Sequence, residues 1–134
     1  MAGYSKRNLA EKLGLKAGMK CLFVNAPEDY LHQLGEVTKE LEIDSVINGN
    51  YDFIQFFADL LSDLTKNFSG LKSALAKNGS LWISWPKLSS GIKNDLNENL
   101  VMKTGLEKGL VDVKVSAIDE VWSGLKFVYR LKDR

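Results

Sequence analysis

The sequence predicts a three-layer α/β domain in which a mostly parallel sheet lies between helices. Apolar strands alternate with amphipathic helices along most of the chain, which is the pattern of parallel strands joined by crossover helices. The last two predicted strands follow each other with no room for a helix between them, so we expect them to form an antiparallel pair. The 134 residues fit a single domain that spans residues 1–134.

The first part of the chain predicts a short helix, a strand and a second helix. Ser5 can cap the first helix and Gly14 can end it. Residues 20–25 are an almost continuous apolar run, which is typical of a strand covered on both faces. Pro27 suits the first turn of the helix that follows this strand.

The middle of the chain contains its most regular helical pattern. Residues 43–47 can form a short strand, and residues 51–58 form a strong apolar one. An apolar stripe spaced at three and four residues then predicts a helix, which Asn78-Gly79 is expected to end. The stripe comprises Leu61, Leu64, Phe68, Leu71 and Leu75.

The central strand is predicted at residues 81–86, which are rich in aromatic and β-branched side chains and stop at a proline. Asp95 and Glu98 resemble the capping box of a helix that stops at Gly109. Period-two alternation then predicts the two terminal strands, at residues 111–117 and 125–131, joined by a loop over residues 118–124 that contains Trp122.

The composition is that of an ordinary globular protein. Apolar residues make up 45% and charged residues 26% of the chain, and 18 basic against 17 acidic residues leave a net charge of +1. This balance provides no basic surface for nucleic acid, and no apolar run reaches the length of a membrane span. The charged N-terminus is not followed by an apolar signal core, so we expect a cytoplasmic protein.

The single cysteine and the single histidine limit the possible sites. Cys21 alone allows no intrachain disulfide, and its place in an apolar strand is typical of a small core residue. One cysteine and one histidine, His32, cannot supply the usual ligand set of a zinc site within one chain. We therefore expect no bound metal.

Six segments carry a family resemblance that covers nearly the whole chain. They are Gly3-Tyr4-Ser5, Lys12-Leu13-Gly14, Asn25-Ala26-Pro27, Leu81-Trp-Ile-Ser-Trp-Pro-Lys87, Gly109-Leu-Val-Asp-Val-Lys114 and Trp122-Ser-Gly-Leu-Lys126. Together they resemble an uncharacterised bacterial family of small proteins, domain of unknown function number three thousand and fifty-two. The order of elements resembles a shortened Rossmann-like fold of class I S-adenosylmethionine methyltransferases, which end in a hairpin whose last strand inserts antiparallel into the sheet. These resemblances imply a scaffold and no particular activity.

The usual cofactor site of such methyltransferases is altered in this sequence. Their first strand leads into a glycine-rich turn, because the backbone must approach the cofactor closely. Here the turn reads Asn25-Ala-Pro-Glu28, and Pro27 also removes an amide donor. No acidic ribose-binding residue is evident, since we expect Asp44 at the start or middle of the second strand. We therefore expect no cofactor bound in the usual mode.

Candidate ligand-binding residues follow the ends of the predicted parallel strands, which face the same crevice. The residues expected near one another are Asn25, Asp59, Trp85 and Lys87. Lys87, Ser89 and Ser90 precede a helix, whose first amides and dipole could help them to hold an anion. The alternative, which we favour, is a solvated loop that caps its own helix; for Asn25 likewise we favour a simple turn residue over one that lines a cleft.

Two classes of function remain open. The first is a small binding or regulatory module on a degenerate methyltransferase-like scaffold. The expected ligand of the crevice, whether it is bound by such a module or acted on by an enzyme at the strand carboxyl ends, is small and anionic or nucleotide-like. The second is an enzyme of unassigned chemistry that uses Lys87, Ser89, Ser90 and Asp59. We prefer the non-enzymatic interpretation, because the sequence provides no Ser-His-Asp or Cys-His set for nucleophilic catalysis.

Overall fold

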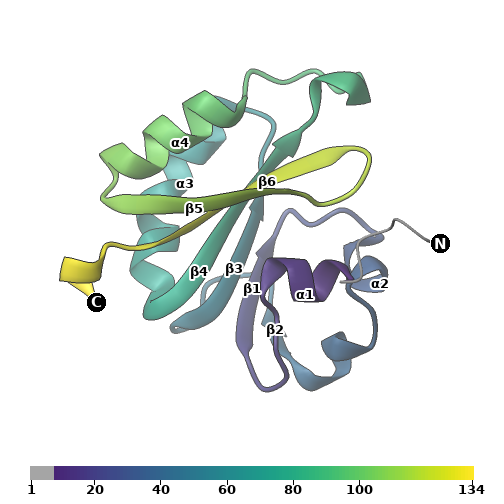
Figure 1. The fold of residues 1–134 in the computed structure, drawn as a ribbon, viewed down its shortest axis with the longest axis vertical. Helices are drawn as coiled ribbons and strands as arrows, with labels where there is room; N and C mark the ends of the chain where they lie inside the picture. Colours follow the sequence, from purple (N-terminus) through teal and green to yellow (C-terminus); the bar gives the residue numbers. More distant parts are fainter. Residues whose placement is uncertain (1–7) are drawn as a thin grey trace.

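The computed structural model describes residues 8–134 and contains one six-stranded sheet with the strand order β2-β1-β3-β4-β6-β5 (Figure 1). The strands are β1 (Lys20–Val24), β2 (Glu42–Asp44), β3 (Tyr51–Phe57), β4 (Leu75–Pro86), β5 (Leu110–Ala117) and β6 (Trp122–Tyr129). β1 to β4 pair in parallel, whereas β6 lies antiparallel between β4 and β5. The predicted fold class, a mostly parallel sheet with an antiparallel terminal pair, is therefore confirmed.

Helices cover both faces of the sheet and complete the three layers (Figure 1). The α-helices are α1 (Leu9–Leu13), α2 (Tyr30–Leu34), α3 (Leu61–Ala74) and α4 (Glu98–Glu107), and short 3-10 helices span Gly35–Glu40, Leu88–Ser90 and Leu131–Asp133. α1 and α2 pack on one face with the aromatic side chains of β1 and β3, while α3 and α4 pack on the other face. No helix in residues 8–134 has the length and hydrophobicity that a membrane span requires.

Several element boundaries differ from the predicted ones. Ser5, the predicted cap of the first helix, lies outside the described residues, and α1 is capped by Asn8 through a capping box with Glu11. The stripe residue Leu75 belongs to β4, because it pairs with Tyr51 of β3 after α3 has ended at Ala74. Tertiary pairing here overrides a helical pattern that would have run on to Asn78-Gly79.

The two tryptophans of β4 point to opposite faces of the sheet, as strand geometry requires. Trp82 is fully buried on the face of α1, where its indole N–H donates to the carbonyl oxygen of Leu13 at 3.0 Å. Trp85 is 6% exposed and belongs to the core beneath α3 and α4. Both are therefore core residues, and Trp82 also attaches α1 to the centre of the sheet.

A polar network lies inside the core between β3, β4 and α2. The Ser84 hydroxyl donates to the Gln55 side-chain oxygen at 2.6 Å, and the Gln55 amide nitrogen donates to the Tyr30 hydroxyl at 3.0 Å. All three side chains are at most 1% exposed. Burying Gln55 is tolerable because both ends of its amide have partners.

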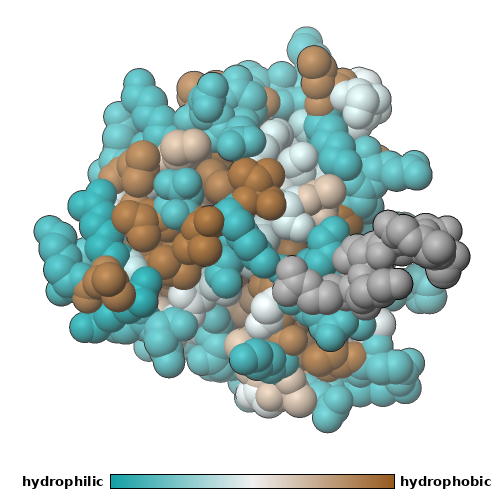
Figure 2. All heavy atoms as spheres, in the orientation of Figure 1, coloured by the Kyte–Doolittle hydropathy of each residue, from teal (hydrophilic) through white to brown (hydrophobic). Residues whose placement is uncertain are grey.

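The outer strands expose hydrophobic surface on the side of the sheet that Figure 2 shows. Hydrophobic atoms gather there over β5 and β6, where no helix lies in front of the strands. The edge strand β5 exposes Val113 and Val115 among charged neighbours, and its register shifts between Asp112 and Lys114. Such an irregularity with flanking charges disfavours pairing of an edge strand with another chain.

The burial of the apolar stripe of α3 predicts how a substitution there changes the stability of the fold. Phe68 is fully buried and packs edge to face on Phe127 of β6, with ring centroids 5.7 Å apart. We expect Phe68→Ala to lower the free energy of unfolding by roughly 3–5 kcal/mol, because the lost ring leaves a cavity. Chemical denaturation measures this loss, with Thr65→Ala on the exposed side of α3 as control; a loss below about 1 kcal/mol for Phe68→Ala would contradict the packing.

Candidate functional site

The carboxyl ends of β1, β3 and β4 lie side by side at one edge of the sheet. Val24 pairs with Phe56, and Phe57 pairs with Ser84, so the three strands end at nearly the same level. The predicted site residues that follow these strands are therefore all at this edge. They are Asn25 after β1, Asp59 after β3, and Trp85 and Lys87 at the end of β4.

Two cavities at this edge of the sheet are lined by predicted site residues. The first, here called the edge cavity, measures about 480 Å³ and lies between β4 and the start of α4. The second, here called the β1–β2 cleft, measures about 420 Å³ and lies between the ends of β1 and β2. Trp85 and Lys87 line the edge cavity and Asn25 lines the cleft, whereas Asp59, Ser89 and Ser90 line neither. The six predicted residues therefore do not share one pocket.

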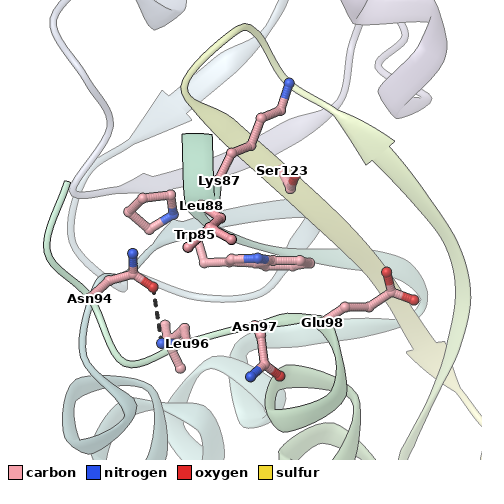
Figure 3. A pocket seen from close by; sticks show the side chains of 9 residues that line it. Trp85, Lys87, Leu88, Asn94, Leu96, Asn97, Glu98 and Ser123 are labelled. Atoms are coloured by element: carbon pink, nitrogen blue, oxygen red, sulfur yellow. Dashed lines mark hydrogen bonds between the residues drawn. The ribbon is translucent and has the colours of Figure 1, made fainter. Parts of the chain in front are cut away.

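The edge cavity is built around the side chain of Trp85. Figure 3 shows the Trp85 ring with Ser123 of β6 on one side and Asn97 and Glu98, at the start of α4, on the other. The Trp85 indole N–H has no hydrogen-bond partner among residues 8–134, although no fully buried side-chain nitrogen or oxygen there lacks one. The indole N–H is therefore not fully buried, and it is free to donate to a ligand in the cavity that the Trp85 side chain lines.

Lys87 lines the edge cavity with its side chain but directs its charge elsewhere. In Figure 3 its amine points away from the Trp85 ring, toward the loop that joins β5 and β6. That loop contains Asp119, whose ionisation the Lys87 charge favours. The Lys87 backbone N–H donates to the carbonyl oxygen of Val121 at 2.7 Å, so the end of β4 is attached to the same loop.

Asp119 serves the loop as a hydrogen-bond acceptor. Its carboxylate accepts from the Gln33 amide at 3.0 Å and from the backbone N–H groups of Val121 and Trp122 at 2.8 Å. Burial alone would raise its pKa, but these hydrogen bonds together with the charge of Lys87 lower the pKa below the usual value. A carboxylate that stays ionised at neutral pH is unsuited to act there as a general acid.

The hydroxyl of Ser90 is occupied by the loop itself. It donates to the Lys87 carbonyl oxygen at 2.7 Å and accepts from the backbone N–H of Ile92 at 3.1 Å. These bonds satisfy the backbone of the loop itself, while α4 is capped by Asn97 and not by Ser89 or Ser90. Ser89 is exposed beside Ser90.

The predicted start of the last helix is wrong, and the correction defines the cavity wall. α4 begins at Glu98 and is capped by Asn97, whose side-chain oxygen accepts from the N–H of Leu100 at 2.9 Å. Asp95 instead accepts from the N–H of Leu61 at 2.6 Å and so caps α3. The sequence pattern could not reveal that Asp95 serves a helix distant in the chain.

Sequence reasoning therefore missed part of the cavity lining. The missed lining residues are Leu88, Asn94, Leu96, Asn97, Glu98 and Ser123. The asparagines at positions 94 and 97 were the available signal, because asparagine is common in turns and at helix N-caps. Ser123 was assigned to a loop, but β6 begins at Trp122, whose ring packs edge to face on Phe57 with centroids 5.1 Å apart.

Solved methyltransferase structures share this fold at low sequence identity. An S-adenosylmethionine-dependent methyltransferase from Aquifex aeolicus gives a TM-score of 0.64 at 16% identity, covering 89% of this chain and 86% of that one. Magnesium protoporphyrin IX methyltransferase from Synechocystis with bound SAH gives 0.59 at 12% identity, covering 91% and 78%. A TehB-like methyltransferase from Corynebacterium glutamicum gives 0.55 at 10% identity, covering 96% and 91%.

The comparisons establish the fold of this protein as that of class I S-adenosylmethionine methyltransferases. No protein-family model matches the sequence, and a comparison with curated proteins finds no significant match. The resemblance to the uncharacterised bacterial family therefore stays a prediction.

The β1–β2 cleft does not fit the cofactor of these methyltransferases in its usual mode. Asn25 adopts a φ of +59°, the left-handed conformation that a glycine turn favours, but its side-chain amide donates to the Phe57 carbonyl oxygen at 3.3 Å. The side chain thus bridges β1 and β3, where the backbone would have to approach a ligand. Pro27, which follows, has no N–H to donate.

Asp44 lies at the last position of β2, and not at the start or middle as predicted from the sequence. An acidic residue is thus present where a ribose could be bound. However, its carboxylate accepts a hydrogen bond from the Tyr51 hydroxyl at 2.6 Å, within the protein. The reason for the error is that β2 has only the three residues Glu42–Asp44, so it ends earlier than the apolar pattern indicates.

The capping role of Asp95 predicts a small loss of stability. We expect Asp95→Ala to lower the free energy of unfolding by about 1 kcal/mol, because the first amide of α3 loses its acceptor. Asp95→Asn, which keeps a side-chain oxygen, is the matched control and should lose much less. Urea denaturation of both variants measures the difference; equal losses for the two would contradict the cap.

The altered cleft predicts that S-adenosylmethionine does not bind in the usual mode. Titration calorimetry should show no binding at micromolar concentrations of the cofactor, since Asn25 and Pro27 replace the glycine turn. A dissociation constant of about 10 µM or tighter, close to 7 kcal/mol of binding free energy, would contradict this prediction.

Proposed function

We propose that this protein is a non-catalytic binding module on a methyltransferase-like scaffold, and that the edge cavity binds a nucleotide-like ligand. The proposal depends on one observation: the indole N–H of Trp85 has no hydrogen-bond partner among residues 8–134, and Trp85 lines a cavity of about 480 Å³ together with Glu98 and the Lys87 stem. This size lies within the range of roughly 300–1,000 Å³ of small-molecule pockets. Donors and acceptors from three elements converge there.

The charges of the cavity favour a nucleotide over a simple anion. Glu98 lies in the first turn of α4 and would repel a bare anion placed against the start of that helix. A ribose, in contrast, can donate its hydroxyl groups to the Glu98 carboxylate. The amine of Lys87 points away from the Trp85 ring (Figure 3). Because the lysine side chain is long and flexible, its amine could contact a phosphate placed at the mouth of the cavity.

Binding without catalysis is favoured by the titratable groups around the cavity. Glu98 is the one carboxylate among the described residues that line the edge cavity. It lies beside the Trp85 ring, whereas the amine of Lys87 points away from that ring (Figure 3). Neighbouring Asp119 is held ionised by backbone amides. General acid–base chemistry needs two groups with suitable pKa values close to one reacting atom, and the cavity does not present such a pair.

Thermal shift with adenosine, AMP and inorganic phosphate tests the proposal. We expect AMP to stabilise the protein more than adenosine does, because any ligand that binds the native state raises its stability. Lys87→Ala should weaken AMP binding by roughly tenfold or more and leave adenosine binding unchanged, since a charged contact contributes about 1.5–3 kcal/mol.

Lys93 provides the matched control, because it is exposed in the same loop and does not line the edge cavity. Lys93→Ala should leave AMP binding within about twofold of wild type, as expected for a distant surface charge. The proposal fails if purine and pyrimidine nucleotides at millimolar concentration produce no shift. It also fails if the two lysine variants weaken AMP binding equally.

A further inference from the structure

A third cavity lies against α3 and shares no lining residue with the edge cavity. It measures about 310 Å³ and is enclosed by α3, the ends of β1 and β3, and the segment that follows β2. We call it the α3 cavity. Its volume falls at the lower end of the range for small-molecule pockets, roughly 300–1,000 Å³.

The floor and one wall of the α3 cavity are apolar. Val24 and Phe56, which are register partners on β1 and β3, form the floor together with Leu71 of α3. Val46 and Ile47 form the wall, and these two side chains are 73% and 52% exposed. Adjacent branched aliphatic side chains exposed beside an apolar cavity gain free energy when a ligand covers them.

Hydrogen bonds from Tyr51 and Lys20 hold the segment that carries Val46 and Ile47 in place. The fully buried Tyr51 donates its hydroxyl proton to the Asp44 carboxylate at 2.6 Å and accepts from the Asn48 N–H at 2.7 Å. Lys20 adds a bond from its amine to the Asn48 carbonyl oxygen at 3.0 Å. Burial and the bond to Asp44 raise the pKa of Tyr51, so its hydroxyl stays protonated at neutral pH. The wall is thus ordered before a ligand arrives, which lowers the entropy cost of binding.

The helix side of the cavity supplies a cation and an opening. Lys66 is the one charged side chain among the lining residues, and it forms no ion pair within residues 8–134. Gly70 lies one turn further along α3, on the same side of the helix. A Cβ atom at Gly70 would meet no heavy atom within 4 Å, so the missing side chain leaves the cavity open. Glycine inside a helix lowers the stability of the helix relative to alanine. Gly70 therefore leaves this space open at a cost in folding stability.

We infer that the α3 cavity binds a small amphipathic carboxylate, whose apolar tail covers Val46, Ile47 and the floor while its carboxylate pairs with Lys66. The charge complementarity is specific, because none of the described residues that line the cavity is acidic. This inference is independent of the function proposed for the edge cavity.

Titration of the protein with straight-chain carboxylates of six to ten carbons, followed by NMR, tests the site directly. Octanoate should shift the amide signals of Val46, Ile47 and Gly70. Gly70→Leu fills the open space and should weaken octanoate binding by about tenfold or more. Ser69→Leu is the matched control, because Ser69 is exposed on α3 outside the cavity, and this variant should bind octanoate as wild type does.

The charged contact is tested by comparing octanoate with octanol. Lys66→Met should weaken octanoate binding by about tenfold or more and leave octanol binding unchanged, since only the carboxylate pairs with Lys66. Tyr51→Phe should weaken both ligands, because it loosens the wall. The inference is overturned if no carboxylate of the series binds at concentrations below about 5 mM, since a dissociation constant above this value is too weak for a specific site. Sedimentation that shows a dimer in wild type and a monomer in Gly70→Leu would overturn it too, and would assign this surface to a second copy of the chain.

Discussion

Gln55 is buried at the centre of the sheet, where an amide without partners would cost more free energy than most core contacts contribute. Its two hydrogen bonds, from Ser84 on β4 and to Tyr30 on α2, therefore constrain three elements at once. They hold β3 and β4 in one register and place α2 against the end of β1. This constraint contributes to the geometry of the carboxyl edge, since the cavities there are lined by the ends of these strands and by the residues that follow them.

The loops at this edge are attached to one another by backbone hydrogen bonds. Asp95 caps α3, and its own N–H donates to the Asp59 carbonyl oxygen at 3.2 Å. The end of β4 is joined to the β5–β6 loop, which Asp119 closes. The Asp119 carboxylate is thus a structural group of the loop, and Asp59 joins the network through its backbone carbonyl oxygen. Around the edge cavity, the polar side-chain atoms of Trp85, Glu98 and Ser123 form no hydrogen bond within residues 8–134.

The scaffold keeps the methyltransferase arrangement of strands while altering the turn that defines the cofactor site. Asn25 keeps the left-handed backbone conformation of a glycine turn, but its amide occupies the space that a glycine would leave open. Tyr51 similarly engages the acidic residue at the end of β2 and uses it to order the wall of the α3 cavity. Groups that serve a cofactor in the fold family thus have internal partners in this chain.

The sequence by itself determined the parallel sheet, the antiparallel terminal pair, the buried stripe of α3 and the opposite directions of Trp82 and Trp85. These features follow from local periodicity, which side-chain geometry imposes on every helix and strand. Tertiary structure decided the rest, because the deciding contacts join residues far apart in the chain. Leu75 became a strand residue by pairing with Tyr51, and Asp95 capped a helix that starts 34 residues earlier. Three of the six predicted site residues were divided between two cavities, and the other three line neither. No local pattern encodes such contacts, since each depends on which loop folds back beside which strand end.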